Sequence, residues 1–102
     1  MNYKLRNEEK MRKYLSKRAC VNSVTDIDFQ DTIDYFLLAI DFIEETRDGK
    51  PKPREGACLT AIIDEEDIEV WVIFDYIVEN NEEIVVIDFD YNYDDYANNL
   101  ML

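Results

Sequence analysis

The chain has 102 residues, of which 24 are acidic and 11 are basic, so its formal net charge is −13 at pH 7. This length fits a single domain, and a hydrophobic content of 47% is enough for a core, which excludes an acidic disordered tail. The strong negative charge disfavours direct binding to nucleic acid or to anionic membranes and favours a basic protein partner.

The negative charge is concentrated in the second half of the chain. All eleven basic residues lie at or before Arg54, where ten acidic residues nearly balance them. From Glu55 onward there are fourteen acidic residues and no Lys or Arg. We therefore expect the second half to carry the surface that a basic partner recognises. Acidity that serves only solubility is the alternative explanation.

Two helices are expected in the first half, which we define as residues 1–46. The first covers residues 7–19 and is basic, and we expect nearby acidic elements to neutralise it. The second begins at a cap on Thr25 and runs to about residue 47. Its core-facing residues recur at helical spacing: Phe29, Ile33, Phe36, Leu37, Ile40 and Ile43. The segment 47–56 contains Pro51 and Pro53 and is expected to be a loop.

Three strands are expected in the remaining residues, 57–102, because apolar residues alternate there and β-branched and aromatic types are frequent. They lie near 57–63, 68–78 and 83–91. A two-residue turn at Asn80 and Asn81 places Phe74 opposite Ile87. A four-residue turn over 64–67 places Ala61 opposite Val70 in the first hairpin. The predicted fold class is α+β, a single domain over 1–102 with two N-terminal helices packed on a three-stranded antiparallel meander.

The face of this meander that points away from the helices combines carboxylates with apolar side chains. The predicted register places Trp71 opposite Asp90 and Ile73 opposite Asp88. Aromatic anchors surrounded by charge are typical of protein-binding surfaces. Coverage of this face by the first helix or by a dimer partner is the alternative. The residues expected to contact a partner are Glu69, Trp71, Asp75, Asp88, Asp90, Tyr91, Tyr93, Asp94 and Asp95.

The sequence lacks the residues on which common catalytic sites depend. It contains no His, only two Gly, and no nucleophile motif around its Ser residues. Cys20 and Cys58 lack metal-binding spacing and are expected to be buried, reduced thiols. We therefore predict a protein that is not an enzyme and that binds no cofactor. With no signal-like N-terminus and no membrane-spanning apolar run, we expect it in the cytoplasm of a bacterial host cell.

Oxygen-bearing side chains alternate through Asp88–Asp94, as they do at the start of an EF-hand calcium loop. Tyr93 stands at the position that needs Gly, and Asn99 stands at the position of the final Glu. The alternating edge of a strand explains the same spacing without a metal. We therefore predict no metal site.

The order of two helices followed by three antiparallel strands resembles the layout of the RelE/ParE toxins, a family of ribonucleases and gyrase toxins. The span Glu69–Tyr76, followed by Ile84–Ile87, is similar to the central hairpin of that family. A short strand at Tyr3–Arg6 would complete the layout. The ribonuclease members work through basic residues on the sheet, and the three predicted strands have none. The resemblance therefore implies the fold and not the toxin activity.

The size, acidity and Asn/Asp/Tyr/Ile-rich composition resemble those of small inhibitors that phages make against host nucleases, including DNA mimics and anti-CRISPR proteins. This resemblance implies carboxylates on a rigid fold in place of phosphates. We therefore expect a non-enzymatic inhibitor of a basic nucleic-acid-handling protein, with a CRISPR effector nuclease as the leading candidate. The alternative is an immunity protein or antitoxin that neutralises a basic toxin. The sequence leaves the oligomeric state open.

Overall fold

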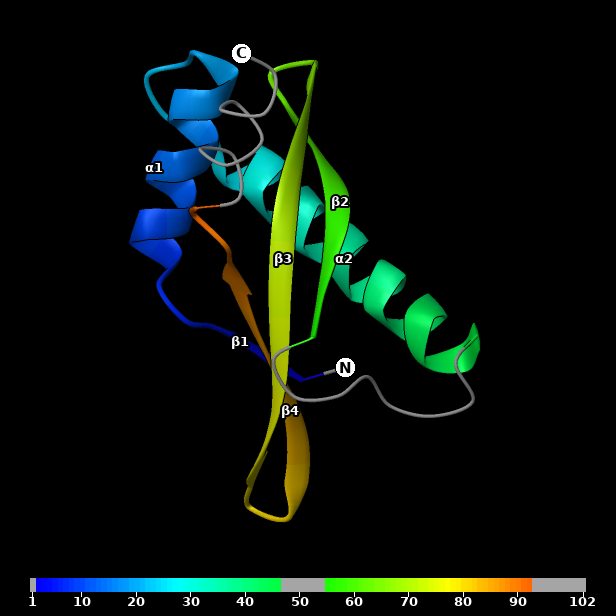
Figure 1. The fold of residues 1–102 in the computed structure, drawn as a ribbon. Helices are drawn as coiled ribbons and strands as arrows, with labels where there is room; N and C mark the ends of the chain where they lie inside the picture. Colours follow the sequence, from blue (N-terminus) through cyan, green and yellow to red (C-terminus); the bar gives the residue numbers. More distant parts are fainter. Residues whose placement is uncertain (1, 47–54, 93–102) are drawn as a thin grey trace.

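The computed structural model describes residues 2–46 and 55–92 as an α+β fold (Figure 1). The elements in chain order are β1 (Tyr3–Leu5), α1 (Glu8–Ala19), α2 (Asp26–Thr46), β2 (Glu55–Ile63), β3 (Glu66–Glu79) and β4 (Glu82–Phe89). The strands form one mixed sheet in the order β1-β4-β3-β2. The fold class and the two helices agree with the sequence prediction. The predicted antiparallel meander is present as β2, β3 and β4. The prediction that the sheet has only these three strands is wrong, because a fourth strand joins it in parallel.

This fourth strand is β1, which pairs with β4 so that Lys4 lies beside Val86 and Leu5 beside Ile87. Three residues are too few for an alternating pattern to stand out, and no local turn connects β1 to its partner. Parallel strands need a long crossover, which α1, α2 and the other two strands supply here. The pairing brings the first basic residues of the chain onto the sheet.

Both helices begin at side chains that cap their free backbone N–H groups. Asn7 Oδ1 accepts from the backbone N–H of Lys10 at 3.1 Å, and Thr25 Oγ1 accepts from that of Asp28 at 3.1 Å. The cap predicted at Thr25 is confirmed. Helix α1 ends at Cys20, whose φ of 58° is left-handed. This Cys and Cys58 are both exposed, so the prediction of buried thiols is wrong.

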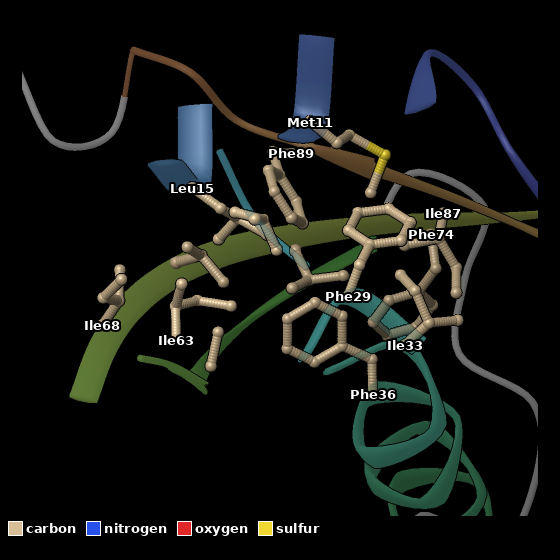
Figure 2. Packing of buried hydrophobic residues seen from close by; sticks show 14 of the residues in the cluster. Met11, Leu15, Phe29, Ile33, Phe36, Ile63, Ile68, Phe74, Ile87 and Phe89 are labelled. Atoms are coloured by element: carbon tan, nitrogen blue, oxygen red, sulfur yellow. The ribbon is translucent and has the colours of Figure 1, made fainter. Parts of the chain in front are cut away.

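The core lies between the two helices and one face of the sheet (Figures 1 and 2). Helix α1 contributes Met11 and Leu15, and α2 contributes Phe36 among others, each fully buried. On the sheet side, alternate residues of β3 such as Val72 and Phe74 are also fully buried. Their alternation follows from the period of two along a strand. The opposite face of the sheet is not covered by either helix.

The β3–β4 register was predicted correctly, and the β2–β3 register was not. Phe74 pairs with Ile87, as the turn at Asn80 and Asn81 requires. In the first hairpin Ala61 pairs with Ile68 instead of Val70, because the turn consists of only two residues. A shift of two residues keeps every side chain on its predicted face, so apolar pairing alone could not detect it.

The first residues of β2 and β3 also differ from the prediction. Strand β2 begins at Glu55, so the last two residues of the predicted loop 47–56 belong to the sheet. Strand β3 begins at Glu66, two residues before the predicted start. Residues 47–54 lie outside the described part of the chain. The tip of the β3–β4 hairpin extends beyond both helices (Figure 1). Val78, near this tip, is 72% exposed.

Candidate functional site

The candidate site is the sheet face opposite the helices, here called the outer face. Neither α1 nor α2 covers it, since both pack on the other side (Figure 1). Its carboxylates on β3 are Glu69, Asp75 and Glu79, with apolar residues between them. Asp88 near the end of β4 and Asp90 just after it add two more. The outer face consists of Gly56, Cys58, Glu69, Trp71, Ile73, Asp75, Ile77, Glu79, Ile84, Val86, Asp88 and Asp90.

Two basic side chains from the N-terminus reach the outer face, which sequence reasoning had expected to contain none. The Nη2 atom of Arg6 lies 3.3 Å from Asp75 Oδ2, and its Nε lies 3.8 Å from Asp88 Oδ2. Lys4 Nζ lies 2.5 Å from Glu79 Oε1. The parallel β1–β4 pairing explains this, because it sets Lys4 beside Val86. Two of the predicted partner-binding carboxylates are thus already paired within the chain.

These ion pairs are partly open to water and therefore contribute about 1 kcal/mol or less each to stability. The side chain of Arg6 is 47% exposed, whereas those of Asp75 and Asp88 are only 15% and 20% exposed. The ion pairs matter mainly for the electrostatic potential of the outer face and for the orientation of its carboxylates. Arg6 holds the two carboxylates in place and lowers the negative potential at the centre of the outer face.

Trp71 is half-buried on the outer face, where its indole lies over Gly56 on the neighbouring strand. A Cβ atom at Gly56 would come within 2.3 Å of the indole Nε1. The missing side chain of Gly56 is therefore what allows the ring to settle against β2. The prediction that Trp71 lies opposite Asp90 agrees with the hydrogen bond from the Asp90 backbone N–H to the Trp71 carbonyl, 2.9 Å long.

The remaining predicted carboxylates differ in their surroundings. Glu69 is exposed at the end of β3 near α1, where Arg18 Nη2 donates to its carbonyl oxygen at 3.3 Å. Asp90 is half-buried, and its Oδ1 accepts from the backbone N–H of Asn92 at 3.0 Å. No ion pair joins either carboxylate to a cation among the described residues. Tyr93, Asp94 and Asp95 lie outside the described residues.

Tyr91 lies on the helix side of the sheet, in an aromatic cluster with Tyr14 and Phe89. Its ring centroid is 5.3 Å from that of Tyr14 and 6.0 Å from that of Phe89, and Lys10 Nζ stands 4.2 Å from its centre. Burial, followed by the negative charge of Asp88, raises the pKa of Tyr91 to about 12. Tyr91 thus packs α1 onto the sheet and does not belong to the outer face.

Sequence reasoning missed a second apolar surface, on α2. Tyr35, Leu38 and Phe42 are 52%, 68% and 66% exposed, and Ile27 is 75% exposed. These four residues are here called the α2 stripe. The spacing i, i+3, i+7 from Tyr35 to Phe42 was available in the sequence. It was overlooked because the buried stripe of the same helix had already accounted for most of its apolar residues.

Within residues 2–46 and 55–92, no group of three or more His, Cys, Asp or Glu side chains could hold a metal ion. The helices in these ranges are too short or too polar to cross a membrane. Comparisons with protein-family models, curated proteins and solved structures found no match. Function is therefore inferred from the surfaces themselves.

Proposed function

We propose that this protein is a non-enzymatic acidic inhibitor that binds a basic nucleic-acid-handling protein, with a CRISPR effector nuclease as the candidate target. One observation carries the proposal. A sheet face left open by both helices presents carboxylates around a half-buried tryptophan on a hydrogen-bonded framework. A sheet holds such groups in fixed positions, so little conformational entropy is lost when a partner binds.

The charge of the outer face supports a basic partner even after its internal ion pairs are counted. It carries five carboxylates, and Lys4 and Arg6 are the two cations that pair with them. The exposed Glu69 and the half-buried Asp90 flank Trp71 and are the carboxylates best placed to meet partner cations. The acidic residues Asp64–Asp67, in the β2–β3 turn and the first positions of β3, extend the same field. Such a field accelerates encounter with a positively charged surface.

Trp71 supplies the apolar contact that a purely charged surface lacks. Interface hot spots are enriched in tryptophan, particularly where surrounding residues exclude water. Here Ile73 and Ile77 are partly exposed on the same strand face and can be buried by a partner, whereas the adjoining Ile84 and Val86 are already buried in the fold. A basic nucleic-acid channel that meets this surface would therefore gain both charge pairing and apolar burial.

A DNA competition assay tests the proposal. Purified CRISPR effector nucleases, loaded with guide RNA, are mixed with labelled target DNA and increasing amounts of the protein. The protein is expected to reduce DNA binding and cleavage at concentrations near that of the effector. The Trp71→Ala variant should bind the effector about 2 kcal/mol more weakly, within the usual range for a hot spot.

A matched pair of variants separates the outer face from general acidity. Glu69→Gln with Asp90→Asn removes two outer-face charges, and Glu45→Gln with Asp34→Asn removes two charges from exposed positions of α2. Only the first pair should weaken inhibition. The outer face is excluded as the binding surface if both pairs weaken inhibition equally, or if neither does.

A further inference from the structure

Helix α2 is apolar on two sides, and only one of them faces the core. Phe29, Ile33, Phe36 and Ile40 form the buried side. The α2 stripe lies on the other side, and three of its members are more than 60% exposed. Single exposed apolar residues are ordinary, but a row of four along one helix marks an interaction surface.

An open groove of about 410 Å³ adjoins the α2 stripe, between α2 and the edge strand β2. Its lining combines carboxylates, hydroxyls and apolar groups. The lining residues are Asp28, Asp31, Thr32, Tyr35, Thr60 and Ile62. Because β2 pairs only with β3 among the described strands, its second edge is open along this side.

Thr32 gives the groove an unusual chemical feature. Its side chain is only 3% exposed, and its Oγ1 has no hydrogen-bond partner among the described residues. A buried hydroxyl without a partner is destabilising, because it has lost its hydrogen bonds to water without gaining others. Beside it, Asp28 is held in place because its Oδ2 accepts from the backbone N–H of Asp64 at 3.1 Å. The groove thus offers a fixed carboxylate next to an unsatisfied hydroxyl.

The negative charge around this surface favours a positively charged binding partner. From Asp26 to Thr46, α2 contains seven acidic residues and no basic residue, and β2 adds no basic residue. In a two-fold dimer formed through the α2 stripe, these carboxylates would face their own copies. Like charges brought together in this way oppose association, whereas a cationic partner gains from them.

We propose that the α2 stripe and its groove dock a cationic amphipathic helix of a partner protein. Apolar side chains of that helix pack on Leu38 and Phe42, in the helix-in-groove mode of recognition. One Lys or Arg enters the groove with its methylene stem between Tyr35 and Ile62. Its charged head meets the carboxylates of Asp28 and Asp31 and donates to the hydroxyl of Thr32. This surface lies apart from Trp71 and does not require a nuclease as the partner.

The test is a nuclear magnetic resonance titration of the isotope-labelled protein with a synthetic helical peptide of Leu and Lys in amphipathic spacing. Two control peptides replace either every Lys by Glu or every Leu by Ser. The Leu/Lys peptide should shift amide signals of α2 and β2, including those of Tyr35, Leu38 and Ile62. Neither control peptide should bind comparably.

Three variants make the assignment specific. Leu38→Ser with Phe42→Ser should weaken binding at least tenfold, and Asp31→Asn should weaken it severalfold. Val78→Ser removes an equally exposed apolar side chain from the β3–β4 hairpin and should leave binding unchanged. Circular dichroism verifies that all three variants keep the fold, which is expected because the replaced side chains are exposed.

Several results would overturn the inference. Shifts centred on the outer face, or equal binding of the Glu-containing peptide, would show that the groove does not select a cationic helix. Sedimentation that reveals a dimer disrupted by the Leu38 and Phe42 changes would assign the stripe to a second copy of this chain. Because no nuclease is used, these outcomes are independent of the DNA competition assay.

Discussion

Among single residues, Gly56 and Trp71 pack closely together on the outer face. The indole occupies the space that a side chain at Gly56 would need, with only 2.3 Å between the ideal Cβ position and Nε1. The cross-strand contact explains why a large apolar side chain is half-buried on a face that no described helix covers. It also means that Trp71 is held in place before any partner arrives.

Gly56→Ala should displace the indole toward water. We expect longer-wavelength tryptophan emission, stronger quenching by acrylamide, and a loss of stability of about 1–3 kcal/mol from overpacking. The signal is unambiguous because Trp71 is the only tryptophan in the chain. Thr60→Ala, at an exposed position of β2 opposite Glu69, is the control and should leave the emission unchanged. Unaltered emission in the Gly56 variant would contradict the contact.

Tyr91 predicts a specific pH dependence. Its pKa in the fold is about 12, above the ordinary value of 10, because burial and then the charge of Asp88 disfavour the phenolate. The stability that this group contributes is therefore complete below pH 10 and is lost as the pH rises toward 12. Denaturant unfolding across this range should show the loss, and Tyr91→Phe should remove that part of it. Titration of Tyr91 together with the exposed tyrosines would contradict its burial.

At the scale of elements, the two hairpin turns place four residues in left-handed conformations. Asp64 and Glu65 have φ values of 50° and 66°, and Asn80 and Asn81 have values of 51° and 63°. Asn tolerates this region, whereas Asp does so less well and Glu poorly. The first turn is thus less favourable locally than the second. The same difference explains why only the second turn could be identified from sequence.

Replacing Asp64 by Asn and Glu65 by Gly should stabilise the protein by about 1 kcal/mol, because Asn-Gly is preferred in this type of hairpin turn. For a domain of this size the thermal midpoint should rise by about 4–8 °C. Asn81→Gly in the second turn is the matched control and should give a smaller gain. A loss of stability in the first variant would favour the four-residue turn expected from sequence.

The elements that local patterns define were predictable, and those that depend on distant pairing were not. The spacing of Phe29, Ile33 and Phe36 specified α2, and alternation specified β3 and β4. A short strand at Tyr3–Arg6 was indicated only by the resemblance to the RelE/ParE layout. No local pattern identifies β1, because it has only three residues and depends on pairing with β4, more than 75 residues later in the chain. The pairing of β2 with β3 was predicted two residues out of register. Such a shift leaves each side chain on the same face of the sheet, so the alternation of apolar residues cannot reveal it.

The positions of the site residues could be predicted where the pairing of their strands could be predicted, as for β3 and β4. Alternation along β3 correctly placed Glu69, Trp71 and Asp75 on one face, because every second side chain of a strand points to the same side whatever its partner strand. The pairing of Arg6 with Asp75 and Asp88 was not foreseen, since it depends on the parallel addition of β1. Surface electrostatics therefore required the complete strand order, and sequence patterning alone overestimated the free negative charge.

On the scale of the whole molecule, basic residues of the first half are used to neutralise nearby or distant acids. Arg12 Nη1 lies 3.0 Å from Asp26 Oδ1, and Lys13 Nζ lies 3.1 Å from Glu9 Oε1. Together with Lys4 and Arg6, these pairs agree with the expectation of internal neutralisation. The net charge of −13 therefore arises mainly from acidic residues of α2, of the β2–β3 turn and of strands β3 and β4.

The most direct test of the central claim is the rate at which the protein associates with its basic target as ionic strength is varied. Charge-driven recognition predicts rapid association at low salt and a steep fall as screening increases. Glu69→Gln with Asp90→Asn should slow association and flatten this dependence. Arg6→Gln, which unmasks two outer-face carboxylates, should accelerate association at low salt. Rates that are independent of salt and unaffected by all three changes would contradict the account.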